Sequence, residues 1–297
     1  MEVQPLGHLH GITFAWTGHV PEGDTIHRLA NVLRPRIVGE KVRELRIRRA
    51  EFSLGAFEGA SVVGVEAMGK HLLVHFDNAM SLHAHMGMTG LVHCYAARER
   101  KRRGAQFVAF SLSLERAEVV GYRVPRVRVL RTGAIAQDPI LSALGEDLLS
   151  ADPNLDVVVA SLRAQGDRPL GEAIMDQGAV AGIGNVVKSE VLFRLKYDPF
   201  ATVASFTNEQ LLALVLDATS VLRFNVDATP RGRVTRFDGL SPRRSVSVYG
   251  RKDEPCYDCG TRIDMRRQGA SRRSTYFCPR CQGCEYILSV ATSKEQP

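Results

Sequence analysis

The chain reads Asp176-Gln177-Gly178-Ala179-Val180-Ala181-Gly182-Ile183-Gly184-Asn185 between two segments that the sequence predicts to be helical. Three glycines in so short a turn allow positive φ angles and a close approach of another part of the backbone. Amide groups at the N-terminus of the following helix would then point outward and form an anion site. Taken alone, the stretch also fits a tight turn between two helices, with Asn185 as an ordinary N-cap.

Helical patterns continue on both sides of this turn. Asn154 is placed to cap a helix whose apolar residues recur at helical spacing, and Pro169 suits the first turn of a second helix. A third helix follows the glycine turn. The fourth begins with a capping box, Thr207 with Gln210, and is predicted to run to about Leu222.

The first half of the chain has a different pattern. A helix is predicted near its start, with Asp24 as N-cap and Pro35 as its end, because apolar residues recur between them at positions i, i+3, i+4 and i+7. From about residue 42 to residue 130 apolar and polar residues alternate, which is typical of β-strands. We therefore predict an α+β fold, in which an N-terminal β-sandwich with a leading helix precedes a helical domain.

Composition limits the class of protein. The chain has 297 residues, of which 44% are hydrophobic, so it can bury a sizeable core. No run of eighteen or more apolar residues occurs, and the first twenty residues lack the pattern of a secretion signal. We expect a cytoplasmic, nucleoid-associated monomer that makes no contact with membranes.

Positive charge is concentrated late in the chain. Residues 231–273 contain twelve Lys and Arg against five Asp and Glu, which accounts for the whole net charge of +7. Such a segment suits a polyanion, because each neutralised phosphate releases counterions. The shorter basic run at residues 98–103 is better explained as a solvated loop.

Four of the cysteines form the pairs Cys256-x2-Cys259 and Cys278-x2-Cys281. Eighteen residues separate the two pairs, which is typical of a tetrahedral four-cysteine Zn²⁺ site on a β-hairpin. Disulfides are the alternative, but nothing in the sequence indicates export, and cytosolic thiols stay reduced. Cys94 and Cys284 are left over, and we expect both to be ordinary thiols.

Three features together resemble one family. The opening Pro21-Glu22-Gly23-Asp24-Thr25, the turn at residues 180–185 and the terminal four-cysteine pattern are similar, in order and approximate spacing, to the formamidopyrimidine-DNA glycosylase and endonuclease VIII family. The resemblance implies a catalytic β-sandwich domain at residues 21–136, a helix-two-turn-helix domain at 137–240, a zinc finger at 241–285 and a tail at 286–297. It also implies a bifunctional DNA glycosylase and abasic-site lyase that acts on damaged double-stranded DNA and holds one structural Zn²⁺.

The resemblance assigns catalytic roles residue by residue. It makes Pro21 the nucleophile that attacks C1′ of the damaged nucleotide, and Glu22 the acid that helps open the sugar ring. Lys70, in Gly69-Lys70-His71, matches the lysine that assists proton transfer and holds a phosphate. Without the family, Lys70 would be interpreted as a solvated lysine at the end of a strand.

Three further residues match positions that contact DNA. Asn185 matches the phosphate ligand of the helix-two-turn-helix motif, and Arg273 the finger arginine that grips the phosphate beside the lesion and takes part in catalysis. An arginine suits this task because its planar fork makes bidentate contacts. Met88 lies where the family fills the gap left by the flipped base, although a buried core methionine is the alternative. Val187 departs from the tyrosine usual at its position.

The proposed role of Pro21 has a chemical requirement. A nitrogen in a peptide bond has its lone pair tied up by amide resonance, so Pro21 must carry a free amine to act. Such an amine has a pKa of roughly 8 and is partly neutral near pH 7. We therefore expect residues 1–20 to be a non-native or removed extension. Val20 fits a GTG start codon, after which loss of the initiator methionine would expose Pro21; proteolytic maturation is the alternative.

Substrate preference and function class stay open at this stage. The opening at Pro21 is closer to the endonuclease VIII branch, so oxidised pyrimidines are the favoured lesions and oxidised purines the alternative. A non-catalytic protein that binds damaged DNA would use the same finger and Asn185 but lack a free Pro21 amine. A zinc ribbon with a protein partner would leave Lys70, Asn185 and the basic segment unexplained.

Overall fold

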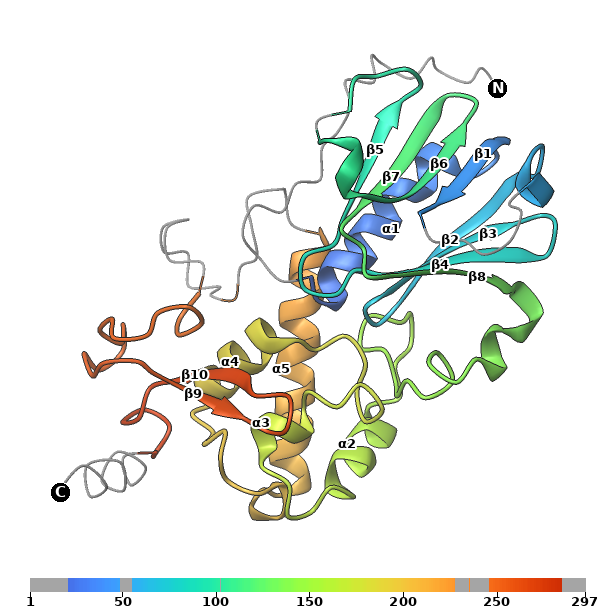
Figure 1. Ribbon diagram of the computed structural model, residues 1–297. Helices are drawn as coiled ribbons and strands as arrows, with labels where there is room; N and C mark the ends of the chain where they lie inside the picture. Colours follow the sequence, from blue (N-terminus) through green and yellow to red (C-terminus); the bar gives the residue numbers. More distant parts are fainter. Residues whose placement is uncertain (1–20, 49–54, 102, 228–234, 236–245, 285–297) are drawn as a thin grey trace, which may run out of the picture. The chain divides into compact units, whose positions relative to one another are not determined.

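The computed structural model describes residues 21–48, 55–101, 103–227, 235 and 246–284. These residues divide into two compact units (Figure 1). Unit 1 contains Pro21 and Thr25–Ser142, and unit 2 contains Glu22–Asp24 and the described residues from 143 onward. No helix in the described part of the chain is long and apolar enough to cross a lipid bilayer. The predicted extension at 1–20 and tail at 286–297 lie outside the described residues.

Unit 1 is a sandwich of two four-stranded sheets with the strand orders β1-β6-β7-β5 and β2-β3-β4-β8. Neighbouring strands are antiparallel throughout. The strands are β1 (Val42–Ile47), β2 (Val62–Met68), β3 (His71–Phe76), β4 (Met80–His85), β5 (Leu91–Ala96), β6 (Val108–Leu114), β7 (Ala117–Tyr122) and β8 (Arg126–Arg131). Short 3₁₀ turns occur at η1 (Gly55–Phe57), η2 (Ala105–Phe107) and η3 (Thr132–Gln137). The alternating pattern thus correctly predicts the sandwich.

One face of each sheet is buried because side chains alternate along a strand. In the second sheet Leu72 and Val74 of β3 and Leu82 and Ala84 of β4 point into the shared core. The residues between them, such as His71 and His83, belong to the opposite face of the same sheet. This outer face carries histidines and arginines.

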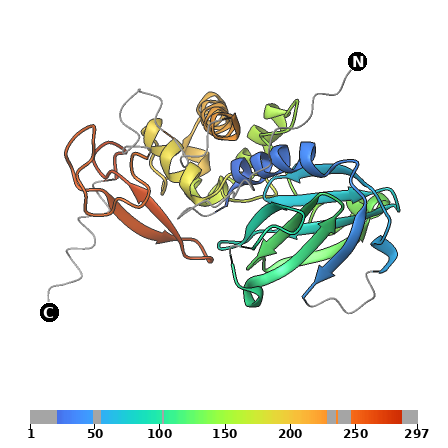
Figure 2. The same ribbon diagram turned by 90° about the horizontal axis from the view of Figure 1, so that it is seen from above.

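The leading helix α1 (Gly23–Ile37) packs on the same core through Ile26 and Leu33, and Figure 2 shows it lying along the strands. Its predicted limits at Asp24 and Pro35 were wrong. Asp24 belongs to the first turn, where a carboxylate is favourable. Pro35 removes only one hydrogen bond near the end of the helix, and the fully buried Ile37 keeps the last turn in place.

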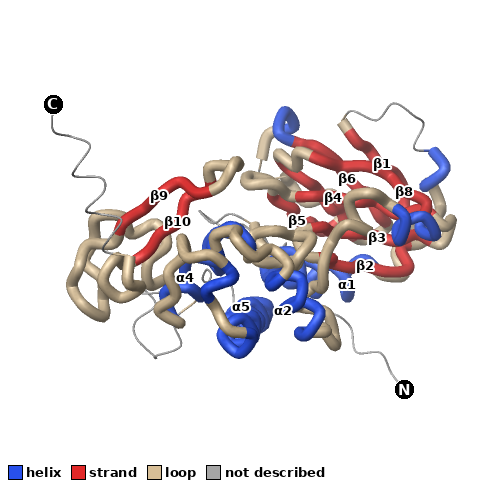
Figure 3. Tube along the Cα trace, turned by 90° about the horizontal axis from the view of Figure 1, so that it is seen from below, coloured by secondary structure: helices blue, strands red, loops and turns tan. Residues whose placement is uncertain are grey.

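The regular secondary structure of unit 2 is mainly helical, as the blue segments of Figure 3 show. Its described helices are α2 (Leu155–Arg163), α3 (Leu170–Ala173), α4 (Asn185–Arg194) and α5 (Asn208–Asp227), with a 3₁₀ turn η4 (Val203–Ser205). The predicted caps are confirmed: the Asn154 side chain accepts a bond from the Val157 N–H, and Thr207 and Gln210 bond each other's backbone N–H. α5 continues past the predicted end at Leu222.

The last described element is a hairpin of β9 (Asp264–Gln268) and β10 (Arg273–Phe277), which are antiparallel. It lies between the two cysteine pairs, as the sequence predicts. Val248 and Ile263 form a small core with two of the cysteines and with Phe193 of α4. The predicted α+β class, with a sandwich, a helical part and a cysteine-bearing hairpin, is therefore confirmed.

Candidate functional site

The carboxylate of Glu22 caps helix α4 from another part of the chain. Its Oε1 accepts a hydrogen bond from the Val186 N–H at 2.7 Å, and its Oε2 accepts one from the Val187 N–H at 3.2 Å. The first N–H groups of a helix have no partner within the helix, and the helix dipole favours negative charge there. Glu22 is only 1% exposed, so this side chain is buried and hydrogen-bonded directly after Pro21.

Glycines make this approach possible. A Cβ on Gly184 would lie 2.2 Å from Cδ of Glu22, and a Cβ on Gly23 would lie 2.7 Å from Cα of Gly182. The Gly23 N–H donates to the Gly182 carbonyl at 2.8 Å, and Gly182 has a φ of +99°. The anion site predicted from the glycine turn therefore exists, and the group that occupies it is Glu22.

Asn185 is the first residue of α4, and Gly184 is the N-cap, so the simple interpretation of Asn185 as an N-cap was wrong. The Asn185 side chain is 9% exposed and donates from Nδ2 to Oγ of Ser274 at 2.8 Å. Its Oδ1 is buried without a hydrogen-bond partner among the described residues. This amide therefore ties α4 to the strand that begins with Arg273.

Lys188, three residues later on the same face of α4, extends this tie. Its Nζ donates to the Ser274 carbonyl at 3.2 Å and to Oγ1 of Thr275 at 2.8 Å, and the side chain is completely buried. The pKa of Lys188 is lowered to about 7, chiefly by burial and also by the charge of Arg273, against the opposing effects of Glu22 and Glu172. Lys188 thus lies within electrostatic reach of both Glu22 and Arg273.

Glu190 fixes a second segment to α4. Its Oε2 accepts hydrogen bonds from Oγ1 of Thr235 and the N–H of Ser247, both at 2.6 Å. Its Oε1 accepts bonds from the N–H groups of Val248 and Tyr249 at 2.8 and 2.7 Å. A completely buried carboxylate needs such partners, and here they hold the backbone that leads into the cysteine-bearing hairpin.

Neither of the buried charged residues of α4, Lys188 and Glu190, was predicted from the sequence. The available signal was spacing, because Lys188 follows Asn185 by three residues and so shares its helix face. Arg273, by contrast, is exposed as the first residue of β10. Several basic residues of the segment at 231–273, those at 231–234 and 236–245, lie outside the described residues.

The four predicted metal ligands converge. The Sγ atoms of Cys256, Cys259, Cys278 and Cys281 all lie within 4.8 Å of one another. Sγ of Cys256 is 3.9 Å from that of Cys281, and Sγ of Cys259 is 3.5 Å from that of Cys278. A tetrahedral site with metal–sulfur bonds of about 2.3 Å separates its sulfurs by about 3.8 Å, whereas a disulfide requires about 2 Å. The cluster fits a metal ion and excludes disulfides between these atoms.

The two remaining cysteines lie apart from this cluster. Cys94 is on β5 in unit 1, where burial raises the pKa of its thiol to about 11. The Sγ of Cys284 lies 3.1 Å from a carboxylate oxygen of Asp198, and burial raises its pKa as well. Both remain protonated near neutral pH, as ordinary thiols do.

Lys70 and Met88 belong to unit 1. Lys70 lies in the turn between β2 and β3, directly before His71, and Met88 follows β4 by three residues with 60% of its surface exposed. His71 pairs with His85 across these strands, so both residues are at the same end of the β3–β4 pair. The alternative of a buried core methionine at Met88 was therefore wrong.

Both units match domains of one known protein family. The N-terminal domain of formamidopyrimidine-DNA glycosylase matches residues 20–137, and the helix-two-turn-helix domain of the same enzyme matches residues 144–235. Together these two matches span most of the chain. The chain belongs to the formamidopyrimidine-DNA glycosylase and endonuclease VIII family.

Curated relatives come from both branches of this family. A probable endonuclease 8 2 of Streptomyces coelicolor is 34% identical over 266 residues, which cover 89% of this chain and 94% of the relative. The DNA-(apurinic or apyrimidinic site) lyase Nei2 of Mycolicibacterium smegmatis is 34% identical over 268 residues, covering 89% and 99%. A formamidopyrimidine-DNA glycosylase of Thermus thermophilus is 30% identical over 280 residues, covering 89% and 98%.

Solved structures agree with the fold. The MutM (Fpg) protein of Thermus thermophilus superposes with a TM-score of 0.70 at 28% identity, covering 89% of this chain and 99% of that one. The Lactococcus lactis Fpg in complex with DNA that contains an abasic site has a TM-score of 0.74 at 19% identity, covering 88% and 99%. The second likeness supports the fold alone.

The buried lysine of this family member gives a test by pH. Because the pKa of Lys188 is about 7 in the folded chain and about 10.5 ordinarily, the unfolded chain binds more protons between these values. Folding stability should therefore rise with pH across this window, by roughly 1 kcal/mol per pH unit near its middle. We predict that the free energy of unfolding of the wild type, measured with urea from pH 7 to 10, increases relative to that of Lys188→Met.

Lys188→Arg is the matched control, because arginine stays charged throughout this range. It should show no corresponding rise. Parallel stability curves for the wild type and Lys188→Met would contradict the environment described for Lys188.

Proposed function

We propose that this chain removes oxidised bases, pyrimidines in preference, from double-stranded DNA and then cleaves the strand at the resulting abasic site through an imine on Pro21. The observation that carries the proposal is the position of Glu22. Its carboxylate is buried and held by the first amides of α4, which fixes the residue that follows the nucleophile. An acid held in one place next to an amine is the arrangement that imine chemistry at a sugar carbon needs.

Family membership makes the chain a DNA glycosylase and DNA-(apurinic or apyrimidinic site) lyase. The oxidised-pyrimidine preference is supported by the opening at Pro21 and by relatives that are named as endonuclease 8 proteins. Base-excision enzymes must extrude their target from the stack, and a damaged base costs less to extrude than an intact one.

The chemistry begins when the free amine of Pro21 attacks C1′. The nitrogen lone pair forms the N–C1′ bond, and the bond from C1′ to the base breaks with its electron pair going to the base, which takes a proton from water. The proton of the new ammonium passes to the Glu22 carboxylate, which then gives it to the ring oxygen as the bond from C1′ to that oxygen breaks, leaving an iminium ion on Pro21. This ion acidifies the C2′ proton, so loss of that proton expels the 3′ phosphate, and a second elimination expels the 5′ phosphate.

DNA binding would involve residues from both units. In unit 2, Asn185 lies on α4 and Arg273 on β10, and these two elements are hydrogen-bonded to each other. The phosphate that Asn185 would bind and the phosphate that Arg273 would bind are therefore held at a fixed spacing. In unit 1, Lys70 would hold a phosphate, and the exposed Met88 would fill the gap left by the extruded base. We further propose the domain limits 21–136, 137–240 and 241–285, which the family matches at 20–137 and 144–235 support.

We also propose that the four-cysteine cluster holds one structural Zn²⁺. The four thiolates and the separations of their sulfurs suit tetrahedral zinc, which prefers such ligands. With four protein ligands the site is closed, so the ion would stabilise the hairpin that carries Arg273 and would take no part in the chemistry.

Trapping with borohydride tests the catalytic proposal. Protein that begins at Pro21 should form a covalent adduct with an oligonucleotide containing an abasic site, because the reagent reduces the imine to a stable amine. We predict loss of the adduct in Pro21→Gly and Glu22→Gln. The control Glu209→Gln changes an exposed carboxylate at the start of α5 and should trap like the wild type.

Glu22→Gln also places an amide N–H against backbone N–H groups, so its circular dichroism must match that of the wild type for the comparison to hold. Undiminished trapping in Pro21→Gly would contradict the assignment of the nucleophile. DNA binding without any adduct in the wild type would favour a non-catalytic damaged-DNA binder.

Metal content tests the proposed zinc site. Elemental analysis of purified protein should find about one zinc ion per chain, and Cys259→Ser should lose most of it together with stability of the hairpin. Cys94→Ser is the matched control, because this thiol is in unit 1, and it should keep its zinc. Equal zinc content in the two variants, or iron in place of zinc, would contradict the proposal.

A further inference from the structure

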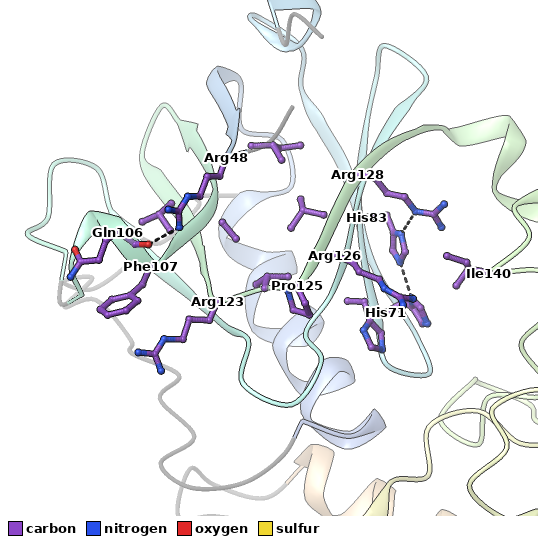
Figure 4. A pocket seen from close by; sticks show the side chains of 16 residues that line it. Arg48, His71, His83, Gln106, Phe107, Arg123, Pro125, Arg126, Arg128 and Ile140 are labelled. Atoms are coloured by element: carbon purple, nitrogen blue, oxygen red, sulfur yellow. Dashed lines mark hydrogen bonds between the residues drawn. The ribbon is translucent and has the colours of Figure 1, made fainter. Parts of the chain in front are cut away.

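Unit 1 contains a pocket that the chemistry proposed above does not use. Its volume is about 600 Å³, and Figure 4 shows the residues that line it. On one side are the rings of His71 and His83 with Arg126 and Arg128, which come from β3, β4 and β8 on the outer face of the second sheet. On the other side, around Phe107, the lining is mostly apolar, with Arg48, Gln106 and Arg123 as its polar residues. No Asp or Glu occurs among the described residues that line it.

A chain of hydrogen bonds runs through the first side of this pocket. Nη2 of Arg128 donates to Oδ1 of Asp138 at 2.6 Å, and Nε of the same guanidinium donates to Nδ1 of His83 at 2.8 Å. Nε2 of His83 lies 2.7 Å from Nδ1 of His71. Figure 4 draws the links between Arg128, His83 and His71 as dashed lines. We call these four residues the histidine relay.

The direction of this relay follows from valence. An arginine can only donate, so Nδ1 of His83 must be the acceptor, and a neutral His83 then carries its proton on Nε2. That N–H must donate to Nδ1 of His71. A neutral His71 consequently carries its own proton on Nε2, so the relay fixes the tautomer of both rings.

Both rings are neutral because charge is disfavoured where they lie. The pKa of His71 is lowered to about 3, chiefly by burial and also by the charges of His85, His83, Arg128 and Lys70. The pKa of His83 is lowered to about 4, chiefly by burial and also by the charge of Arg128, with Asp138 acting in the opposite direction. His71 therefore presents a neutral N–H donor at neutral pH.

The surroundings of this donor are positive. Arg126 and Arg128 line the pocket beside it, and Arg48 and Arg123 line the opposite side. The Arg48 guanidinium is held by the Gln106 carbonyl at 2.7 Å, and that of Arg123 lies 4.4 Å from the centre of the Phe107 ring. Fixed cations around an oriented N–H donor are what an oxyanion requires.

We propose that this pocket binds a phosphate group of a DNA strand, with Nε2–H of His71 and the guanidinium of Arg126 as donors and the histidine relay as the device that orients His71. The proposal rests on the DNA substrate proposed above. Its place in the fold supports a strand over a small free anion. His71 directly follows Lys70, at the end of the β3–β4 pair that also carries the exposed Met88, and the pocket is open and partly apolar around Phe107. In this arrangement His71 contacts the phosphate, and Arg128, His83 and Asp138 are positioning residues.

The tautomers of His71 and His83, measured by NMR, test whether the histidine relay exists. Long-range ¹H–¹⁵N correlation spectra of the full chain labelled in histidine distinguish the two neutral tautomers and the imidazolium, with signals assigned from single histidine variants. At neutral pH we expect both His71 and His83 as neutral rings protonated at Nε2. In Arg128→Met the tautomer of His83 should no longer be fixed, whereas Arg126→Met should leave both tautomers unchanged. An Nδ1–H tautomer or an imidazolium at either residue overturns the proposal.

The ligand is tested with two probes, inorganic phosphate and an undamaged single-stranded oligonucleotide. Each should shift the Nε2 signal of His71. Affinity should fall by about tenfold in Arg126→Met, the loss expected for a charge-assisted hydrogen bond. It should fall by a similar factor in Arg128→Met, because His71 then no longer presents a fixed N–H donor to the phosphate. Arg100→Met removes an exposed arginine of unit 1 outside the pocket and should retain wild-type affinity for phosphate.

The result with the two probes decides between binding sites. If neither probe shifts the Nε2 signal of His71, the proposed site is overturned. If phosphate alone shifts it, the assignment of the site to a DNA strand is overturned. If Arg128→Met does not fold, His83→Phe keeps a ring in place while breaking the relay, and it should release the tautomer of His71. Failure here is separable from failure of the proposed function, because borohydride trapping at Pro21 does not depend on the tautomer of His71.

Discussion

The contact between the Glu22 carboxylate and the first amides of α4 is the interaction on which the proposed site depends. It joins the residue next to Pro21 to the turn at residues 180–185, and it is possible only because Gly184 has no side chain. One carboxylate thus caps the helix and, in the proposed mechanism, is held in place as the catalytic acid. A helix N-terminus without such a partner would leave buried N–H groups unsatisfied.

Helix α4 extends this constraint to the hairpin. All residues from Asn185 to Phe193 are buried, so the helix has no solvent face and its polar residues must find partners inside unit 2. Asn185 and Lys188 bond β10, and Glu190 bonds the backbone at residues 247–249. Glu22, Asn185 and the strand headed by Arg273 are therefore held in one network, and the metal cluster secures the far side of the same hairpin.

Much of this could be predicted from the sequence because the relevant signals are local. The capping box at Thr207, the alternation in the strands and the spacing of the four cysteines each report a short-range physical requirement. The glycine turn predicted an anion site, but a ligand phosphate and the chain's own Glu22 fit the same pattern, and only long-range packing distinguishes them. The environments of Lys188 and of the histidine relay could not be predicted, because their hydrogen-bond partners are distant in sequence. Pro35 misled because a proline near a helix end costs little.

The central claim is that Pro21, next to the Glu22 carboxylate that is fixed on α4, is the nucleophile. It is tested most directly by locating the nucleotide in the borohydride-reduced adduct, through proteolysis and tandem mass spectrometry of the cross-linked peptide. We predict that the sugar remnant maps to the nitrogen of Pro21. A remnant on Lys70 or Lys188 would contradict the claim.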